Sequence, residues 1–152
     1  MTQPALIRAD LHNHTHFSPD SILSPGRFVA QAVRRGLNCI AVTDHNTMGG
    51  VAAVHEAAAT AGLQVIAGEE IRTAEGEVLG LFLTEAVPRG LSAEQTIDRI
   101  QQQGGLAGVP HPYDYLRSGL GQLREELEEY SPEAEPEPEP ESEFAQDELP
   151  LE

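Results

Sequence analysis

The sequence predicts an α/β fold, and two observations support that prediction. Short apolar segments with strand character alternate with amphipathic segments of helical period, and glycine or Ser-Pro sequences separate them. Histidines and carboxylates follow the apolar segments, as His12, His45 and Glu70 do. Functional groups of parallel α/β sheets lie at the carboxyl ends of the strands. These residues end or follow predicted strands, so their positions support the same fold class.

Eight elements are expected along residues 5–109. Strands are predicted at residues 5–12, 38–43, 63–67, 77–84 and 106–109, and helices at residues 25–35, 49–61 and 93–103. Ser24 and Pro25 open the first helix as the N-cap and the first helical residue, and Gly36 ends it. A capping box that begins at Ser92 opens the last helix.

The acidic charge is concentrated at the carboxyl end of the chain. The net charge is -16, from 25 Asp and Glu against nine basic residues, all of which are Arg. Residues 125–152 hold 13 of the acids and no base, which leaves residues 1–124 with a net charge of -3. The Glu-Pro repeats bury too little apolar surface to offset their chain entropy. We therefore expect one domain at residues 1–124 and an acidic, mostly disordered tail at residues 125–152.

This composition argues against several classes of function. The tail repels nucleic acid and anionic membranes, so nucleic acid is expected only as a nucleotide or oligonucleotide substrate. No apolar run approaches membrane-spanning length, and residues 1–4 do not resemble the start of a signal peptide. The single cysteine, Cys39, lies in an apolar run and cannot form a disulfide within one chain. A cytoplasmic protein is expected.

The segment Asp-Leu-His-Asn-His at residues 10–14 carries the strongest chemical signal. Side chains two apart on a strand point to the same face, so His12 and His14 should converge where the first strand ends. Asp20 follows a short turn and could return a carboxylate to the same place, and His45 ends the next strand. Such groupings hold zinc or other transition metals, whereas the alternative is a pair of strand histidines that face solvent.

Four segments in this order resemble the motifs of the PHP family, the polymerase and histidinol phosphatase domain. They are residues 10–20, 41–45, 68–71 and 109–112. The resemblance spans roughly residues 6–120. It implies a distorted (β/α)7 barrel with a two- or three-metal site at the strand ends. It also implies hydrolysis of a phosphoester, such as histidinol phosphate, a nucleotide or a DNA end.

The resemblance also implies metal ligands. His12 and His14 would bind one metal, and Asp20 and His45 would bind another. Glu70 would bridge two metals.

Further residues receive weaker assignments from the same resemblance. His111 would bind the second of the bridged metals. Glu77 stands where many relatives have a His, and it could replace that ligand or be exposed. Glu69 matches a variable position, while Asp10 and Asp44 suit the orientation of imidazoles through their second ring nitrogen.

Two arginines and two further histidines complete the set. Arg72 and Arg117 are candidates for binding the phosphoryl oxygens of a substrate. His16 falls at a variable family position and His55 lies on a predicted helix, so both are expected at the surface.

The chain departs from the family pattern at its carboxyl end. The family's Asp-x-His motif is absent, no histidine follows His111, and the later aspartates are Asp114 and Asp147. The resemblance therefore implies a barrel that is incomplete at its C-terminal side, with an open sheet edge. A homo-oligomer formed over that edge is an option that the sequence leaves open.

The implied function is metal-dependent hydrolysis of a phosphoester by a metal-activated water, with two or three Zn, Mn or Fe ions as cofactors. The substrate would be a small phosphorylated metabolite or a nucleotide. An amidohydrolase is a rival, but many of those bridge their metals through a carboxylated Lys, and this chain has no Lys. The other alternative is a non-catalytic remnant that binds metal or protein.

Overall fold

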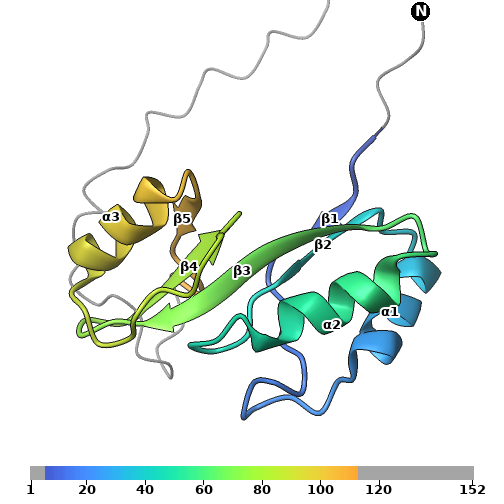
Figure 1. The fold of residues 1–152 in the computed structure, drawn as a ribbon, viewed down its shortest axis with the longest axis horizontal. Helices are drawn as coiled ribbons and strands as arrows, with labels where there is room; N and C mark the ends of the chain where they lie inside the picture. The colour runs from blue at the N-terminus through green and yellow to red at the C-terminus, as the bar shows by residue number, and fades with distance from the viewer. Residues whose placement is uncertain (1–5, 113–152) are drawn as a thin grey trace, which may run out of the picture.

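The computed structural model describes residues 6–112 (Figure 1). Residues 1–5 and 113–152 lie outside the described part. The acidic tail expected at residues 125–152 therefore lies outside it, as does Arg117.

The described residues form one mixed sheet of five strands in the order β1-β2-β3-β4-β5. The strands are β1 (Ala9–Asp10), β2 (Cys39–Val42), β3 (Gln64–Arg72), β4 (Glu77–Leu81) and β5 (Leu106–Gly108). β1, β2 and β3 pair in parallel, whereas β4 is antiparallel to both β3 and β5. The α/β class is confirmed, and the open sheet agrees with the expected incomplete barrel.

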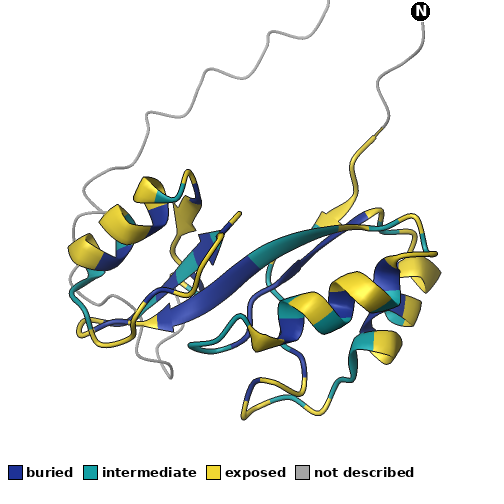
Figure 2. Ribbon diagram, in the orientation of Figure 1, coloured by how far each residue is buried: buried dark blue, intermediate teal, exposed yellow. Residues whose placement is uncertain are grey.

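Three helices cover the two halves of this sheet: α1 (Pro25–Arg34), α2 (Gly49–Ala58) and α3 (Ala93–Gln102). α1 and α2 lie beside the parallel half, and α3 lies beside β4 and β5 (Figure 1). Their outward faces are exposed, while residues 68–71, in the second half of β3, are buried (Figure 2). None of these three helices of the described part has both the length and the apolar character needed to cross a membrane.

Two hydrophobic cores flank the long strand β3. The first joins α1, β2 and α2 through side chains that include Phe28, Ile40 and Val54. The second joins β3, β4 and α3 and includes Ile71 and Ile100. Full burial of each such side chain contributes about 1.5–3 kcal/mol to the free energy of unfolding. Val65 of β3 packs against the first core and Ile71 of β3 belongs to the second, so the two cores hold β3 near both of its ends.

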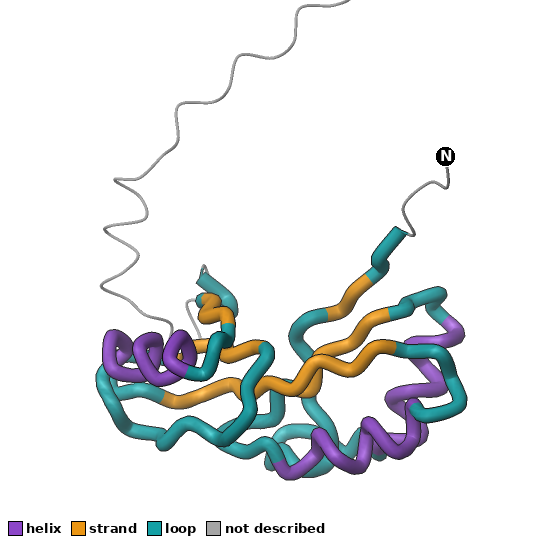
Figure 3. Tube along the Cα trace, turned by 45° about the horizontal axis from the view of Figure 1, so that its top comes forward, coloured by secondary structure: helices purple, strands orange, loops and turns teal. Residues whose placement is uncertain are grey.

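β3 changes partner along its length. Residues 64–67 pair with β2, and residues 68–72 pair with β4. Gly68 lies at the change, where an added Cβ would come within 2.6 Å of the Gly80 carbonyl oxygen. β3 runs through both halves of the sheet (Figure 3), and Glu70 lies in its antiparallel half, opposite Leu79 of β4.

Three predicted strands differ from the observed ones by three residues or more. The strand predicted at residues 77–84 ends at Leu81, because Phe82 has a φ of 61°, outside the extended region. The strand predicted at residues 63–67 continues to Arg72, because pairing with β4 hides Glu69 and Glu70 from water. The first strand is limited to Ala9–Asp10, and the apolar lead-in residues Leu6 and Ile7 are 69% and 67% exposed. The described residues pair β1 on one side alone, so little sheet is present to bury that lead-in.

The predicted helix starts are correct, although the helix predicted at residues 49–61 ends at Ala58, and the two serine caps differ. Ser92 and Gln95 form both hydrogen bonds of the capping box. Ser24 occupies the N-cap position of α1 before Pro25, yet its side chain makes no capping hydrogen bond. Cys39 is buried, as the sequence predicts.

Candidate metal centre

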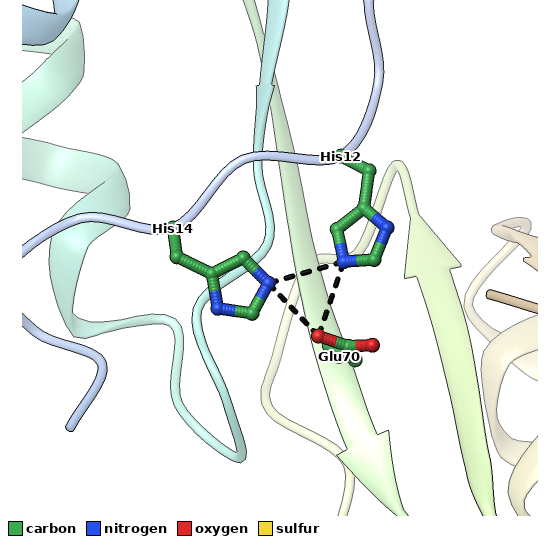
Figure 4. Close-up of side chains that lie close together, drawn as sticks. All are labelled: His12, His14 and Glu70. Atoms are coloured by element: carbon green, nitrogen blue, oxygen red, sulfur yellow. Dashed lines mark hydrogen bonds and ion pairs between the residues drawn. The ribbon is translucent and has the colours of Figure 1, made fainter. Parts of the chain in front are cut away.

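Imidazoles and carboxylates from four neighbouring strands meet around one buried carboxylate, that of Glu70. His12 and His14 lie in the loop that follows β1, and His45 lies just after β2. Glu70 is in β3, and Glu77 is the first residue of β4. The strands thus bring together residues up to 65 positions apart in the sequence. Figure 4 shows His12 and His14 pointing toward Glu70.

The distances suit shared ligation of an ion. Glu70 Oε2 lies 2.9 Å from His14 Nε2 and 3.1 Å from His12 Nε2 (Figure 4). The two Nε2 atoms lie 3.0 Å apart. Two imidazole nitrogens bound at about 2.1 Å to one ion, with an angle between right and tetrahedral, lie about 3.0–3.4 Å apart. The two histidines therefore already have the spacing that one ion requires.

A second grouping forms on the other side of His14. Asp20 Oδ1 lies 3.3 Å from His14 Nδ1, and Asp20 Oδ2 lies 3.4 Å from His45 Nε2. The loop from Thr15 to Asp20 therefore returns its carboxylate to the histidines, as the sequence predicts. These three residues offer ligand atoms that all lie within 4.8 Å of one another.

A third grouping joins His45, Glu70 and Glu77, whose ligand atoms also lie within 4.8 Å of one another. His45 Nδ1 is 3.4 Å from Glu70 Oε2 and 3.7 Å from Glu77 Oε1. The sequence left Glu77 as either a metal ligand or an exposed residue. Its side chain is 12% exposed, so the exposed alternative is not the one observed.

His111 approaches the opposite oxygen of the same carboxylate. Its Nε2 lies 3.7 Å from Glu70 Oε1, and its ring centroid is 4.9 Å from that of His12. The backbone of His111 has a φ of 50°, which is uncommon for a residue other than glycine. The end of β5 thus presents an imidazole to the centre, as expected.

The electrostatics of the centre favour a bound cation. Burial opposes the charged form of Glu70, but hydrogen bonds with His12 and His14 outweigh it and hold the pKa of the carboxyl well below its usual range. The Glu70 carboxylate in turn raises the pKa of the His14 imidazole. Glu70 Oε1 is buried and accepts no hydrogen bond from the described residues. A carboxylate that stays ionised with an oxygen left over fits a divalent ion, and the surrounding nitrogens fit a transition metal.

Two aspartates have a different role from the one predicted. We expected Asp10 and Asp44 to orient imidazoles. Instead, the Asp44 carboxylate accepts the N–H and the hydroxyl of Thr15, at 2.6 and 2.8 Å. Asp10 accepts the backbone N–H of His12 at 3.5 Å. Both carboxylates therefore hold the backbone of the histidine loop, because loop amides near them need acceptors.

The hydroxyl of Ser18 makes the contacts with the histidines that sequence reasoning missed. Its Oγ lies 3.2 Å from His14 Nδ1 and accepts the backbone N–H of His45 at 2.7 Å. Ser18 is 2% exposed. The only signal for this role in the sequence is that Ser18 lies four residues after His14. A serine at that place is also common in an ordinary turn, so the sequence alone did not identify it.

Glu69 and Arg72 occupy opposite faces of β3. Glu69 is buried, and its Oε2 accepts the Val87 N–H at 2.9 Å. Burial raises the pKa of the Glu69 carboxyl, and the Val87 hydrogen bond opposes that rise. Arg72 is exposed, and alternation along the strand gives it the same face as Glu70. Within residues 6–112 its guanidinium makes no ion pair.

The two histidines expected at the surface are there. His55 is exposed on α2, and His16 is exposed in the loop after β1. The His16 ring stacks on Phe17, with a centroid separation of 4.6 Å.

Known proteins resemble this chain in sequence. The sequence model of the PHP domain family matches residues 10–145. An uncharacterized protein of Methanocaldococcus jannaschii is 42% identical over 132 residues, which cover 80% of this chain and 77% of that protein. A 5'-3' exoribonuclease of Haemophilus influenzae is 32% identical over 117 residues, which cover 69% of this chain and 42% of that protein.

A third relative is a phosphatase. The 3',5'-nucleoside bisphosphate phosphatase of Chromobacterium violaceum is 32% identical over 117 residues, which cover 69% of this chain and 41% of that protein. The chain therefore spans about two fifths of each of the two relatives whose activities are named.

Proposed function

This chain belongs to the PHP domain family, and from that premise we propose that it hydrolyses a phosphoester with divalent metal ions held around Glu70. The observation that carries the proposal is the convergence of His12, His14 and His45 on one buried carboxylate oxygen. A phosphatase and an exoribonuclease among the relatives support the type of reaction.

The cofactors proposed are two or three ions of Zn, Mn or Fe. His12 and His14 would hold one ion, and Asp20 and His45 would hold another. Glu70 would bridge two ions, with His111 as a further ligand. When bound, such ions supply Lewis-acid activation of a water molecule and of the phosphoryl group. The mixture of imidazole nitrogens and carboxylate oxygens accepts each of these metals.

Arg72 is the residue proposed to bind the phosphoryl group of the substrate. It lies two residues beyond Glu70 on the same face of β3, and it is exposed. Its guanidinium has five donors in a planar fork that matches phosphate oxygens. Arg117, the other candidate, lies outside the described residues. The substrate class proposed is a small phosphorylated metabolite or a nucleotide.

The test is hydrolysis by the purified full chain of two chromogenic substrates, p-nitrophenyl phosphate and bis-p-nitrophenyl phosphate. Turnover should be lost on chelation and should return when Mn²⁺ or Zn²⁺ is added. His12→Ala should abolish it without unfolding the chain, because that change removes a ligand from the solvent-facing side of the centre. His55→Ala, which removes an exposed imidazole from α2, is the matched control and should retain activity.

Two results would contradict the proposal. Unchanged metal-dependent turnover in His12→Ala would exclude the ligand assignment. Tight metal binding without hydrolysis of either substrate would favour the alternative of a non-catalytic metal-binding module.

A further inference from the structure

Glu77 is held at the metal centre by the sheet. In the register of β3 and β4 it lies opposite Arg72, which is two residues from Glu70. Its neighbour Val78 is buried in the core beneath α3. Because side chains alternate along a strand, Glu77 points to the other face, the one that Glu70 shares. Backbone pairing therefore fixes the Glu77 carboxylate on the side of the centre.

The donors around the Glu70 carboxylate fall into two groups of different chemistry. His12 and His14 offer two nitrogens beside the Glu70 carboxylate. In the second group, which meets the same Oε2 atom of Glu70, His45 offers one nitrogen beside two carboxylates, those of Glu70 and Glu77. Imidazole is a good ligand for zinc, whereas carboxylate oxygens suit harder ions such as Mn²⁺.

Two contacts indicate that the oxygen-rich group is built for a cation. The Glu70 and Glu77 carboxylates converge on a single imidazole nitrogen, His45 Nδ1, at 3.4 and 3.7 Å. The ligand oxygens of the two carboxylates lie within 4.8 Å of each other, so two negative charges repel each other in this partly buried place. Among residues 6–112, no group donates a hydrogen bond to the buried Glu70 Oε1, and the nearest imidazole nitrogen paired with it, His111 Nε2, lies 3.7 Å away. A divalent ion would satisfy both carboxylates together.

We propose that His45 Nδ1, Glu70 and Glu77 form an oxygen-rich ion position, in which His45 uses Nδ1 in place of its Nε2 contact with Asp20, and that Glu77 lowers the selectivity of this position for Zn²⁺ over Mn²⁺. This inference rests on the proposed function and deepens it, because it gives the two groups of donors different metals. Zn²⁺ binds more tightly than Mn²⁺ to any site of this kind. The ratio of the two affinities should nevertheless be smaller at the Glu77 position than at the His12–His14 position.

The experiment compares metal binding by the full chain and three variants after removal of metal with a chelator. Mn²⁺ binding is followed by the loss of the electron paramagnetic resonance signal of the free ion, and Zn²⁺ is then added as a competitor. The variants are Glu77→Gln, Glu77→His and the matched control Glu85→Gln, which alters an exposed carboxylate beyond β4. Circular dichroism confirms that each variant is folded.

The proposal makes a distinct prediction for each variant. Glu77→Gln should weaken Mn²⁺ binding at one site by about 10–100-fold or more. Loss of a residue that only hydrogen-bonds to a metal ligand already weakens binding by that factor, and Glu77 is proposed to be a ligand itself. Glu77→His should raise the ratio of Zn²⁺ to Mn²⁺ affinity at that site by about tenfold or more, since it exchanges an oxygen for a nitrogen. Glu85→Gln should bind both metals as the unchanged chain does.

The outcomes separate this inference from the proposed function. Unchanged Mn²⁺ binding in Glu77→Gln, or an unchanged affinity ratio in Glu77→His, would overturn the role of Glu77 even if hydrolysis persists. The expected metal selectivity without any hydrolysis would support the ion position and count against the proposed function. A chain that binds neither metal would overturn both.

Discussion

The Asp44 carboxylate accepts both the amide N–H and the hydroxyl of Thr15, at 2.6 and 2.8 Å. Asp44 follows β2 and precedes His45, while Thr15 follows His14. Both residues are fully buried. This one pair of hydrogen bonds therefore sets the position of two imidazoles, those of His14 and His45, that follow different strands.

Removal of the Asp44 carboxylate should destabilise the fold and the centre together. Asp44→Ala leaves the buried donors of Thr15 without an acceptor, which should lower the free energy of unfolding by about 1–3 kcal/mol. Mn²⁺ binding should also weaken, because the His14 loop loses its anchor. Urea denaturation and Mn²⁺ titration measure the two effects. Equal stability of Asp44→Ala and the unchanged chain would contradict the anchoring role.

Gly50, in the first turn of α2, should not tolerate a side chain. A Cβ there would clash with the Asp44 carboxylate and would lie 2.8 Å from Thr15 Oγ1. Gly50→Ala should therefore lower the free energy of unfolding by about 1–3 kcal/mol. Gly26→Ala in α1 is the control, since a Cβ there meets nothing within 4 Å.

Thermal or urea unfolding of the two glycine variants gives the comparison. Gly26→Ala should be neutral or more stable by up to about 1 kcal/mol, because alanine reduces the entropy that a helical glycine loses on folding. Similar changes in both variants would contradict the close contact at Gly50.

The two serine N-caps should differ in their contribution to stability. Ser92 accepts the Gln95 N–H within a complete capping box, whereas the Ser24 side chain makes no capping bond. Ser92→Ala should lower the free energy of unfolding by about 0.5–2 kcal/mol, and Ser24→Ala should lower it by less than about 0.5 kcal/mol. Urea unfolding of both variants tests this, and equal losses would show that the two caps are equivalent.

Ser18 should affect metal binding more than its size suggests. Its hydroxyl contacts His14 Nδ1 and accepts the His45 N–H. Ser18→Ala should weaken Mn²⁺ binding by about 10–100-fold, as the loss of residues that orient metal ligands does. Isothermal titration calorimetry measures the affinity, with Thr84→Ala, an exposed hydroxyl beyond β4, as the control. If both variants bind Mn²⁺ alike, Ser18 does not orient the histidines.

The sequence predicts the order of the elements well because apolar spacing, glycines and helix caps are local signals. It could not predict that β3 continues through Glu69 and Glu70, since charged residues usually end a buried strand. Antiparallel pairing with β4 hides both residues, and that pairing depends on residues further along the chain.

The grouping of site residues was predictable where the sequence repeats a known spacing, as it does for His12 and His14. The contacts of Asp44 and Ser18 were not, because they depend on how the loop after β1 folds against the end of β2. Which of its two predicted states Glu77 occupies was also not predictable. It depends on the register of β4 on β3, which the segment that contains Glu77 does not determine by itself.

The most direct test of the account is the metal content of the purified, monodisperse full chain, measured by mass spectrometry after dialysis against equimolar Zn²⁺ and Mn²⁺. The account predicts two or more tightly held ions per chain. It predicts that Glu70→Gln, which removes the charge that His12, His14 and His45 surround, loses most of that metal while it stays folded. Equal metal content in both chains, or none in either, would contradict the claim that Glu70 organises a metal centre.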